Sequence, residues 1–226
     1  MENSNKCLGY VLGGTGDAAP FDRVFTSAEE VDMNHMEKYA AVVLWGGEDI
    51  SPSLYGQRPG RYTGAKEGLS ARDRYENEIC QRAMEKGIPL IGVCRGAQLL
   101  CALAGGSLFQ HVKGHGYGGM HYMHTTDDRV ILSNSLHHQM MNPKGVQHEL
   151  LAWVEPDSDR AAYYEQDDLP VDAEIAPLLE PEVVYFPTIR GLAIQGHPEF
   201  TFGRPDLKDF VDYSCDLVAE YLLNKE

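Results

Sequence analysis

The segment from Ile88 to Leu100 (I-P-L-I-G-V-C-R-G-A-Q-L-L) most constrains the fold of this chain, because an apolar run turns there into a helical pattern around a cysteine. The short apolar run is typical of a strand that is covered on both faces. Gly92 and Gly96 leave space for a tight, strained turn at Cys94. A thiol at such a turn faces a helix N-terminus, which favours the thiolate. The sequence therefore predicts a nucleophilic Cys94, the alternative being a buried structural cysteine.

A second strand end near the C-terminus carries a histidine beside a carboxylate. Residues Gly191–Gln195 form a short apolar segment that leads into Gly196 and then His197, Pro198 and Glu199. Side chains two residues apart in an extended segment point the same way, and Pro198 holds the preceding residue extended. Glu199 can then orient the imidazole of His197. With Cys94 these residues form a nucleophile, a base and an orienting acid.

The remaining apolar patterns predict strands that alternate with helices. The expected elements are a first strand over Cys7–Leu12, a strand over Ala41–Trp45, a helix over residues 71–86 and a closing amphipathic helix over residues 206–223. This alternation predicts an α/β fold of three layers, with a mostly parallel central sheet flanked by helices. Ligands of such sheets bind beyond the carboxyl ends of the strands, where Cys94 and His197 are expected.

A glycine cluster, Gly13-Gly14-Thr15-Gly16, follows the first expected strand. It lacks the lysine and hydroxyl residue of a Walker motif and the G-x-G-x-x-G spacing of dinucleotide sites. We interpret it as a turn, and no cofactor is expected from it.

The chain of 226 residues is 43% hydrophobic and contains no internal repeat or low-complexity linker, so one domain over residues 1–226 is expected. The N-terminus has no signal-peptide pattern, and no apolar run approaches the roughly 20 residues that cross a bilayer. A cytoplasmic location is expected. The five cysteines are scattered without C-x-x-C spacing, which predicts reduced thiols.

The chain carries 19 basic and 34 acidic residues, a formal net charge of −15. A surface of this sign repels nucleic-acid backbones and anionic membranes, so neither is expected as a partner. The charge is compatible with a cationic amine in the substrate, although solubility alone also accounts for it.

Four histidines, His111, His115, His121 and His124, lie close together in the sequence among glycines and tyrosines. Imidazole is a common zinc ligand. However, no cysteine or carboxylate accompanies these histidines at a recognisable metal-binding spacing, and no metal site is expected from them.

Several separated blocks of this sequence, in the same order, resemble the class I glutamine amidotransferase-like proteins and, within them, the gamma-glutamyl hydrolase branch. The blocks are W-G-G-E-D-I-S-P-S-L-Y-G (45–56), A-R-D-R-Y-E-N-E-I-C (71–80), G-I-P-L-I-G-V-C-R-G-A-Q-L-L (87–100), A-G-G-S-L-F-Q-H (104–111), N-S-L-H-H-Q (134–139) and Q-G-H-P-E (195–199). The resemblance covers most of the chain and implies a flavodoxin-like arrangement, a cysteine-dependent C–N hydrolase and no metal or cofactor.

Carried over position by position, the resemblance implies that Cys94 attacks the side-chain carbonyl of a gamma-glutamyl amide and forms a gamma-glutamyl thioester. His197 would move the proton, and Glu199 would orient His197. The backbone N–H groups of Gly47 and Arg95 would form the oxyanion hole.

The same resemblance implies substrate contacts by Gly46, Gln98, Asn134, Ser135 and His137. For the last three, much of the contact in relatives comes from the backbone. His137 and its neighbour His138 are otherwise expected to line the pocket or pack in a loop.

Two features depart from the family pattern. Relatives usually carry a bulky residue before the catalytic histidine, where this chain has Gly196, which puts the shape of the pocket in question. The acidic, proline-rich segment Tyr163–Pro187 resembles the family least. We interpret it as a solvated excursion, with a specificity loop or a partner surface as the alternative.

Three functions are compatible with the sequence. The first is a stand-alone hydrolase of gamma-glutamyl amides, acting on a small-molecule amide or on glutamine. The second is a glutaminase subunit that supplies ammonia to a separate synthetase. The third is a catalytically silent binding protein on the same scaffold. A homodimer is compatible with each of them.

Overall fold

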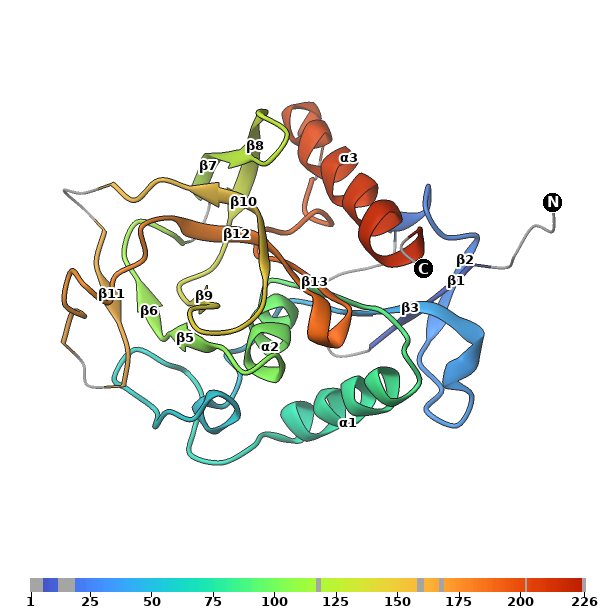
Figure 1. Cartoon of the computed structure of the whole chain (residues 1–226), viewed down its shortest axis with the longest axis horizontal. Coiled ribbons are helices and arrows are strands. Elements are labelled where there is room, and N and C mark those ends of the chain that lie inside the picture. Colours follow the sequence, from blue (N-terminus) through green and yellow to red (C-terminus); the bar gives the residue numbers. More distant parts are fainter. Residues whose placement is uncertain are drawn as a thin grey trace.

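The computed structural model describes residues 6–11, 19–116, 119–157, 161–166, 169–201 and 203–224. Within them, a nine-stranded sheet has the strand order β2-β1-β3-β4-β13-β12-β10-β7-β8 (Figure 1). Its strands are β1 (Cys7–Tyr10), β2 (Ser27–Glu30), β3 (Tyr39–Leu44), β4 (Leu90–Val93), β7 (Gly119–Thr125), β8 (Val130–Ser135), β10 (Glu149–Val154), β12 (Glu180–Phe186) and β13 (Gly191–Ile194).

Two short sheets and several helices complete the described part of the chain. The short sheets pair β5 (Ser107–Phe109) with β9 (Met140–Asn142), and β6 (His111–Val112) with β11 (Tyr163–Tyr164). The α-helices are α1 (Ala71–Glu85), α2 (Arg95–Leu103) and α3 (Lys208–Leu217). Short 3-10 helices are η1 (Ala19–Phe21), η2 (Met36–Lys38), η3 (Pro52–Tyr55), η4 (Pro187–Ile189) and η5 (Pro205–Leu207), and η6 (Val218–Leu223) is a π-helix. None of the helices within the described residues combines the length and apolar character that a bilayer crossing requires.

The sheet has a parallel half and an antiparallel half. Strands β2, β1, β3, β4 and β13 pair in parallel, which confirms the α/β class and the parallel sheet expected around Cys94. From β13 onwards, each neighbouring pair up to β8 is antiparallel. The antiparallel half extends the sheet beyond the strands that the apolar patterns indicated.

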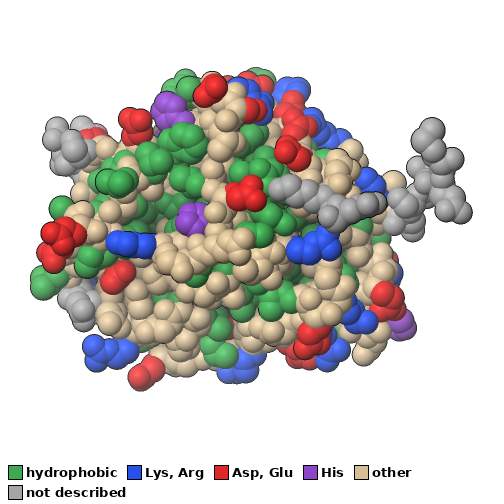
Figure 2. Space-filling view, in the orientation of Figure 1, with side chains coloured by type: hydrophobic (Ala, Val, Ile, Leu, Met, Phe, Trp, Pro, Cys, Tyr) green, Lys and Arg blue, Asp and Glu red, His purple; other side chains and the backbone are tan. Residues whose placement is uncertain are grey.

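The three layers follow from the alternation of side chains along each strand. Val42 and Leu44 of β3 pack with residues of α1 and α2 in one apolar core. Ala41 and Val43 point to the other face and pack with residues of α3 and η6. In Figure 1, α1 and α2 accordingly lie on one side of the sheet and α3 on the other. On the face that Figure 2 shows, apolar side chains gather in the upper middle, with charged side chains among them and around the rim.

The helices expected over residues 71–86 and 206–223 are present, with small differences at their ends. Helix α1 begins with a capping box, in which Ser70 and Asp73 exchange side-chain-to-backbone hydrogen bonds. The closing helix is built from η5, α3 and η6 in succession. The first expected strand is β1; Leu12 and the glycine cluster at residues 13–16 lie outside the described residues.

The interpretation of Tyr163–Pro187 as a solvated excursion is wrong for part of that segment. Every residue of β12 is buried, and β12 pairs with both β10 and β13 inside the large sheet. The acidic residues Glu180 and Glu182 hid this strand, because they interrupt the apolar run that normally marks a buried strand. Exposed apolar side chains in the same segment, such as Leu178, do lie at the surface.

Three parallel strands end side by side where the chemistry was expected. Val93 of β4 pairs with Ile194 of β13, and Gly92 pairs with Leu44 of β3. A Cβ on Gly92 would lie 2.5 Å from the carbonyl carbon of Gly96, and a Cβ on Gly96 would collide with the Leu44 carbonyl. The two glycines therefore permit α2 to begin directly against β3 and β4.

A buried network of ion pairs connects α1 to the start of α2. Arg95 is 1% exposed, and its Nη2 lies 2.6 Å from Asp73 Oδ1 while its Nη1 pairs with Glu76. Arg72 Nε lies 2.7 Å from the other oxygen of Glu76. Buried charges of this kind are stable only as a complete set, because each unpaired member would be left without water or a counter-charge.

Replacing Arg95 should therefore destabilise the protein strongly. We expect Arg95→Met to lower the free energy of unfolding by about 3–5 kcal/mol, since it leaves Asp73 and Glu76 buried with one cation fewer. Urea denaturation followed by circular dichroism measures this change. The matched control is Arg82→Met, which removes the exposed pair with Glu78 within α1 and a hydrogen bond to the Met33 carbonyl, and should cost less than about 2 kcal/mol. Equal losses in the two variants would contradict this account of the network.

Candidate active site

Cys94 occupies the turn between β4 and α2 in a conformation that few L-amino acids adopt. Its φ is 50° and its ψ is −104°. Its backbone N–H donates to the Ile194 carbonyl at 2.8 Å, so the end of β4 is tied to the end of β13. Cys94 is only 7% exposed to solvent. A strained, nearly buried cysteine at a strand-to-helix turn is the arrangement in which nucleophiles are held at such sheet ends.

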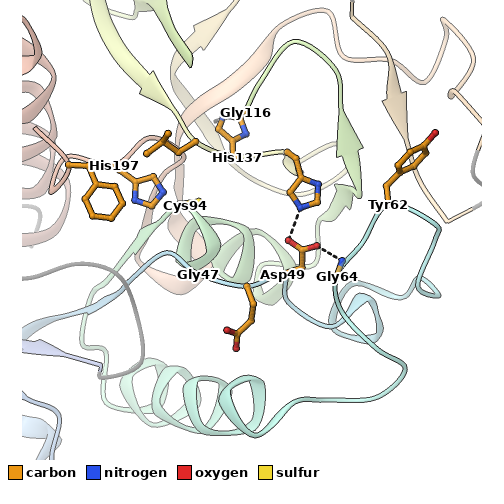
Figure 3. A pocket seen from close by; sticks show the side chains of 12 residues that line it. Gly47, Asp49, Tyr62, Gly64, Cys94, Gly116, His137 and His197 are labelled. Carbon is orange, nitrogen blue, oxygen red and sulfur yellow. Dashed lines mark hydrogen bonds and ion pairs between the residues drawn. The ribbon is translucent and has the colours of Figure 1, made fainter. Parts of the chain in front are cut away.

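His197 and Glu199 follow β13 and lie next to Cys94, as the sequence predicts. His197 Nδ1 lies 2.8 Å from Glu199 Oε1, and both side chains are almost completely buried. Figure 3 shows the ring directly beside the thiol of Cys94. Because Nδ1 faces Glu199, Nε2 is the ring atom available to the sulfur. Cys94, His197 and Glu199 thus lie together at the ends of β4 and β13.

The environment of His197 favours its charged form. Burial alone would lower the pKa of the imidazole, but the interactions with Cys94 and Glu199 outweigh burial and raise the pKa to about 10. The ring of Phe200 also stacks on the imidazole at 4.7 Å between centroids. The resting site is therefore suited to a protonated imidazole beside the sulfur.

These side chains open into a pocket of about 670 Å³ beyond the strand ends (Figure 3). The pocket is lined by Gly47, Glu48, Asp49, Tyr62, Gly64, Cys94, Gly116, Leu136, His137, His138, His197 and Phe200. A cavity of this volume accommodates a small amide together with part of its leaving group.

The Gly46–Gly47 turn after β3 forms one wall of the pocket and is held from behind by Arg72. Arg72 Nη2 donates to the carbonyls of Trp45 at 3.0 Å and Gly46 at 2.9 Å. Gly47 has a φ of +142°, and a Cβ there would collide with the Arg72 guanidinium. With both carbonyls engaged by Arg72, the turn is held from behind while Gly47 lines the pocket.

Gln98 and Asn134 lie behind the pocket and are not among its lining residues. Asn134 Nδ2 donates to the His197 carbonyl and Asn134 Oδ1 accepts from the His197 N–H, both at 2.7 Å. Gln98 Nε2 donates to the Gln139 carbonyl at 3.2 Å. In this structure, Asn134 therefore holds the backbone of His197 in place.

Ser135 and His137 lie on either side of Leu136, and of the two only His137 lines the pocket. Ser135 Oγ is instead 3.0 Å from Nδ1 of His115. The segment after β8 thus contributes Leu136, His137 and His138 to the pocket wall.

The missing side chain at Gly196 is compensated by its neighbours. A Cβ at this position would lie 2.6 Å from Ser133 Oγ and 2.8 Å from Phe210 Cζ. No bulky residue fits here, because Phe210 of α3 already fills the space. Phe200, which lines the pocket and stacks on His197, supplies an aromatic wall instead.

Sequence reasoning missed the polar group opposite the thiol. Asp49 Oδ1 lies 3.0 Å from His138 Nε2, and Asp49 Oδ2 accepts from the Gly64 N–H at 2.7 Å (Figure 3). Burial alone would raise the pKa of Asp49, but His138 and these hydrogen bonds lower it. The same contact raises the pKa of His138, so the two side chains favour an ion pair on this wall of the pocket. The acidic pair Glu48-Asp49 directly after the glycine turn was the available signal.

The other cysteines have no comparable environment. All five cysteines are free and buried, as expected for reduced thiols. Burial raises the pKa of Cys101 to about 12 and that of Cys215 to about 11, and it raises that of Cys80 further. These three thiols therefore remain protonated at neutral pH.

Comparison with known proteins agrees with this geometry. Residues 23–152, more than half of the chain, match the Peptidase C26 family. The chain belongs to the peptidase C26 family. It is thereby a member of the class I glutamine amidotransferase-like superfamily, which confirms the resemblance seen in the sequence.

Individual relatives of this peptidase C26 member cover parts of its chain. The glutamine amidotransferase-like protein YvdE homolog of Lactococcus lactis subsp. cremoris is 37% identical over 102 residues, 45% of this chain and 50% of the relative. The gamma-glutamyl-CDP-amidate hydrolase of Campylobacter jejuni is 32% identical over 75 residues, 31% of each chain. The alignments span half or less of the length of the first curated relatives.

The fold of the C26 member is that of solved glutamine amidotransferases. A glutamine amidotransferase structure from Thermotoga maritima superposes with a TM-score of 0.58 at 16% identity, covering 97% of this chain and 86% of the other. At this identity the likeness shows the shared fold alone, and that fold is the three-layer architecture expected from the sequence.

The raised pKa of His197 gives a prediction for this C26 member. Because the folded pKa of about 10 lies above the ordinary value of 6.5, the stabilisation from protonated His197 is complete below pH 6.5 and is lost as pH rises through 10. We expect Glu199→Gln to lower the pKa of His197. The free energy of unfolding of the variant should lie below that of the wild type at pH 6.5, and this difference should shrink as the pH rises to 10. Ring-nitrogen NMR and urea denaturation over this range measure both effects.

The control for this experiment is Asp32→Asn. His35 Nδ1 and Asp32 Oδ2 form a pair of nearly the same length, 2.7 Å, on the exposed surface. Its removal should leave the titration of His197 unchanged. A His197 ring that titrates near 6.5 in the wild type would contradict the described electrostatics.

Proposed function

We propose that this protein is a cysteine-dependent hydrolase of gamma-glutamyl amides, with Cys94 as nucleophile, His197 as proton carrier and Glu199 as the group that orients His197. The observation that carries the proposal is the His197 ring, which lies beside the Cys94 thiol (Figure 3) and is held at Nδ1 by Glu199 Oε1 at 2.8 Å. Membership of the peptidase C26 family and the partial similarity to a gamma-glutamyl-CDP-amidate hydrolase support the same chemistry.

The proposed reaction has two halves. The Cys94 thiolate attacks the gamma-carbonyl carbon, and the carbonyl oxygen becomes an oxyanion that accepts from the N–H groups of Gly47 and Arg95. Protonated His197 gives its proton to the amide nitrogen as the C–N bond breaks, so the amine leaves and a gamma-glutamyl thioester remains. His197 then takes a proton from water, the hydroxide attacks the thioester, and glutamate leaves as the thiol is restored.

The shape and charge of the pocket are consistent with such a substrate. Asp49 and the exposed Glu48 give one wall acidic oxygens, which suit the alpha-amino group of a glutamyl unit or a cationic leaving group. The aromatic rings of Tyr62 and Phe200 line other parts of the wall. A volume of about 670 Å³ leaves room for the leaving group beyond the glutamyl unit.

The nucleophile is tested with a panel of gamma-glutamyl amides that carry different amines, with glutamine included. We expect wild type to release amine from at least one of them and Cys94→Ala to lose activity by about 1,000-fold or more, as when a triad nucleophile is removed. Cys101→Ala, in the same helix, is the matched control and should keep its activity. After acid quenching, mass spectrometry should find a gamma-glutamyl adduct on the peptide that contains Cys94. Undiminished turnover in Cys94→Ala would reject the proposal.

The oxyanion site is tested through Arg72, which positions the Gly46–Gly47 turn without lining the pocket. Arg72→Lys removes the paired hydrogen bonds to Trp45 and Gly46, and the displaced turn should lower kcat about 10- to 100-fold with little change in KM. Arg82→Lys, on an exposed face of α1, is the control. A rise in KM at constant kcat would show that the turn binds the ground state instead of the oxyanion.

An ammonia-supplying glutaminase is the second candidate function. The similarity to glutamine amidotransferase-like proteins favours it, because the same acyl chemistry releases ammonia from glutamine. Turnover of glutamine that rises sharply when a synthetase is added would support this function. Full activity of the isolated chain on other gamma-glutamyl amides would support the stand-alone hydrolase.

A further inference from the structure

Three histidines and a glutamate converge in a buried cluster next to the pocket. The cluster consists of His115, His121 on β7, His137 after β8 and Glu182 on β12. Glu182 Oε1 lies 3.4 Å from His121 Nε2 and 3.8 Å from His137 Nε2. The His115 ring centroid is 4.6 Å from that of His137 and 5.3 Å from that of His121. Three possible ligand atoms lie within 4.8 Å of one another, one each from His115, His137 and Glu182.

Several polar atoms of this cluster are buried without a hydrogen bond to any described residue. They are both carboxylate oxygens of Glu182, Nε2 of His121 and Nε2 of His137. Glu182 is 1% exposed and His137 is 4% exposed. Leaving such groups unsatisfied in the interior costs several kcal/mol, so a ligand that engages all of them at once would stabilise the fold.

The surrounding hydrogen bonds orient two of the rings as they are oriented at metal centres. His137 Nδ1 donates to the Gln139 carbonyl at 2.9 Å, which leaves the lone pair on Nε2 towards Glu182. His115 Nε2 donates to Glu180 Oε2 at 3.0 Å, and Tyr163 donates to the other oxygen of Glu180 at 2.7 Å. The ligand atom of His115 is then Nδ1, and a bound metal would replace its present contact with Ser135 Oγ at 3.0 Å. Carboxylate and carbonyl acceptors of this kind fix the tautomer of metal-binding histidines and raise their basicity.

The buried carboxylates also suit a cation. Glu182 is buried beside His121 and His137, and Glu180 is buried beside His115. Neutral imidazole and ionised carboxylate are the forms that bind metals.

We propose that His115, His137 and Glu182, with His121 as the fourth ligand, bind a divalent transition-metal ion, and that zinc fits them best. Tetrahedral zinc with bonds of about 2.0–2.1 Å places its ligand atoms roughly 3.3 Å apart, close to the separations from Glu182 Oε1. Nitrogen and carboxylate donors in this number are typical zinc ligands. Magnesium and calcium, which prefer oxygen, fit the three imidazoles less well.

An ion can reach the cluster from the surface. A cavity of about 170 Å³ borders His115, His121 and Glu180, and its rim includes the exposed residues Lys113 and Glu155. On the other side of the cluster, His137 lines the active-site pocket. A bound metal would therefore fix the wall segment that contains His137.

The proposal is tested with the full chain after treatment with a chelator. We expect one Zn²⁺ per chain by calorimetric titration and elemental analysis, a rise in Tm of about 5–10 °C at a hundredfold excess over Kd, and visible absorption bands of four-coordinate Co²⁺. Glu182→Gln and His137→Gln should each lose the binding. His124→Gln is the matched control. His124 lies on β7, as His121 does, but its ring stacks on Trp153 and does not face the cluster.

The thiol of Cys94 is the competing place for zinc. Cys94→Ala should keep the stoichiometry and the Co²⁺ spectrum, because its sulfur is not a ligand of the proposed centre. Three outcomes would overturn the proposal. The first is wild-type protein that binds no zinc, and the second is loss of zinc binding in Cys94→Ala. The third is zinc binding that survives in both Glu182→Gln and His137→Gln. The wild-type stoichiometry and spectrum do not depend on whether the ligand variants fold, and none of these readouts depends on hydrolase activity.

Discussion

The parallel register of β3, β4 and β13 is the constraint on which the candidate active site depends. Pairing Val93 with Ile194 brings the ends of β4 and β13 together, although about a hundred residues separate Cys94 from His197 along the chain. The hydrogen bond from the Cys94 N–H to the Ile194 carbonyl closes this junction. Because side chains alternate along a strand, a slip of one residue would move the imidazole to the opposite face and separate it from the sulfur.

The buried ion pairs behind the site explain why a stretch of α1 matters to chemistry it never touches. Arg95 follows the nucleophile, and its guanidinium is held by Asp73 and Glu76. Arg72, also on α1, holds the carbonyls before Gly47. One face of α1 thus supports both of the backbone segments that we propose as the oxyanion hole, and it does so through charges that water cannot replace.

The sequence was sufficient where a local pattern decides the structure. The glycines around Cys94, the proline after His197 and the apolar spacing within residues 71–86 each act within a few residues, so the strand ends and α1 could be predicted. The catalytic roles of Cys94, His197 and Glu199 stay a prediction. The sequence was insufficient where the outcome depends on distant partners. Glu180 and Glu182 concealed β12 because their histidine and tyrosine partners come from other strands. The space at Gly196 is filled by Phe210 of α3, which no local pattern indicates.

The histidine cluster shows the same limit in a sharper form. His111, His115, His121 and His124 are neighbours in sequence, but the fold separates them. His111 stacks on Tyr62 and His124 stacks on Trp153, whereas His115 and His121 meet His137 and Glu182. Spacing along the chain argued against a metal because the carboxylate comes from β12, about 60 residues away. Since His137 belongs to this cluster and to the pocket wall, the stability of the cluster and the shape of the pocket are coupled through one residue.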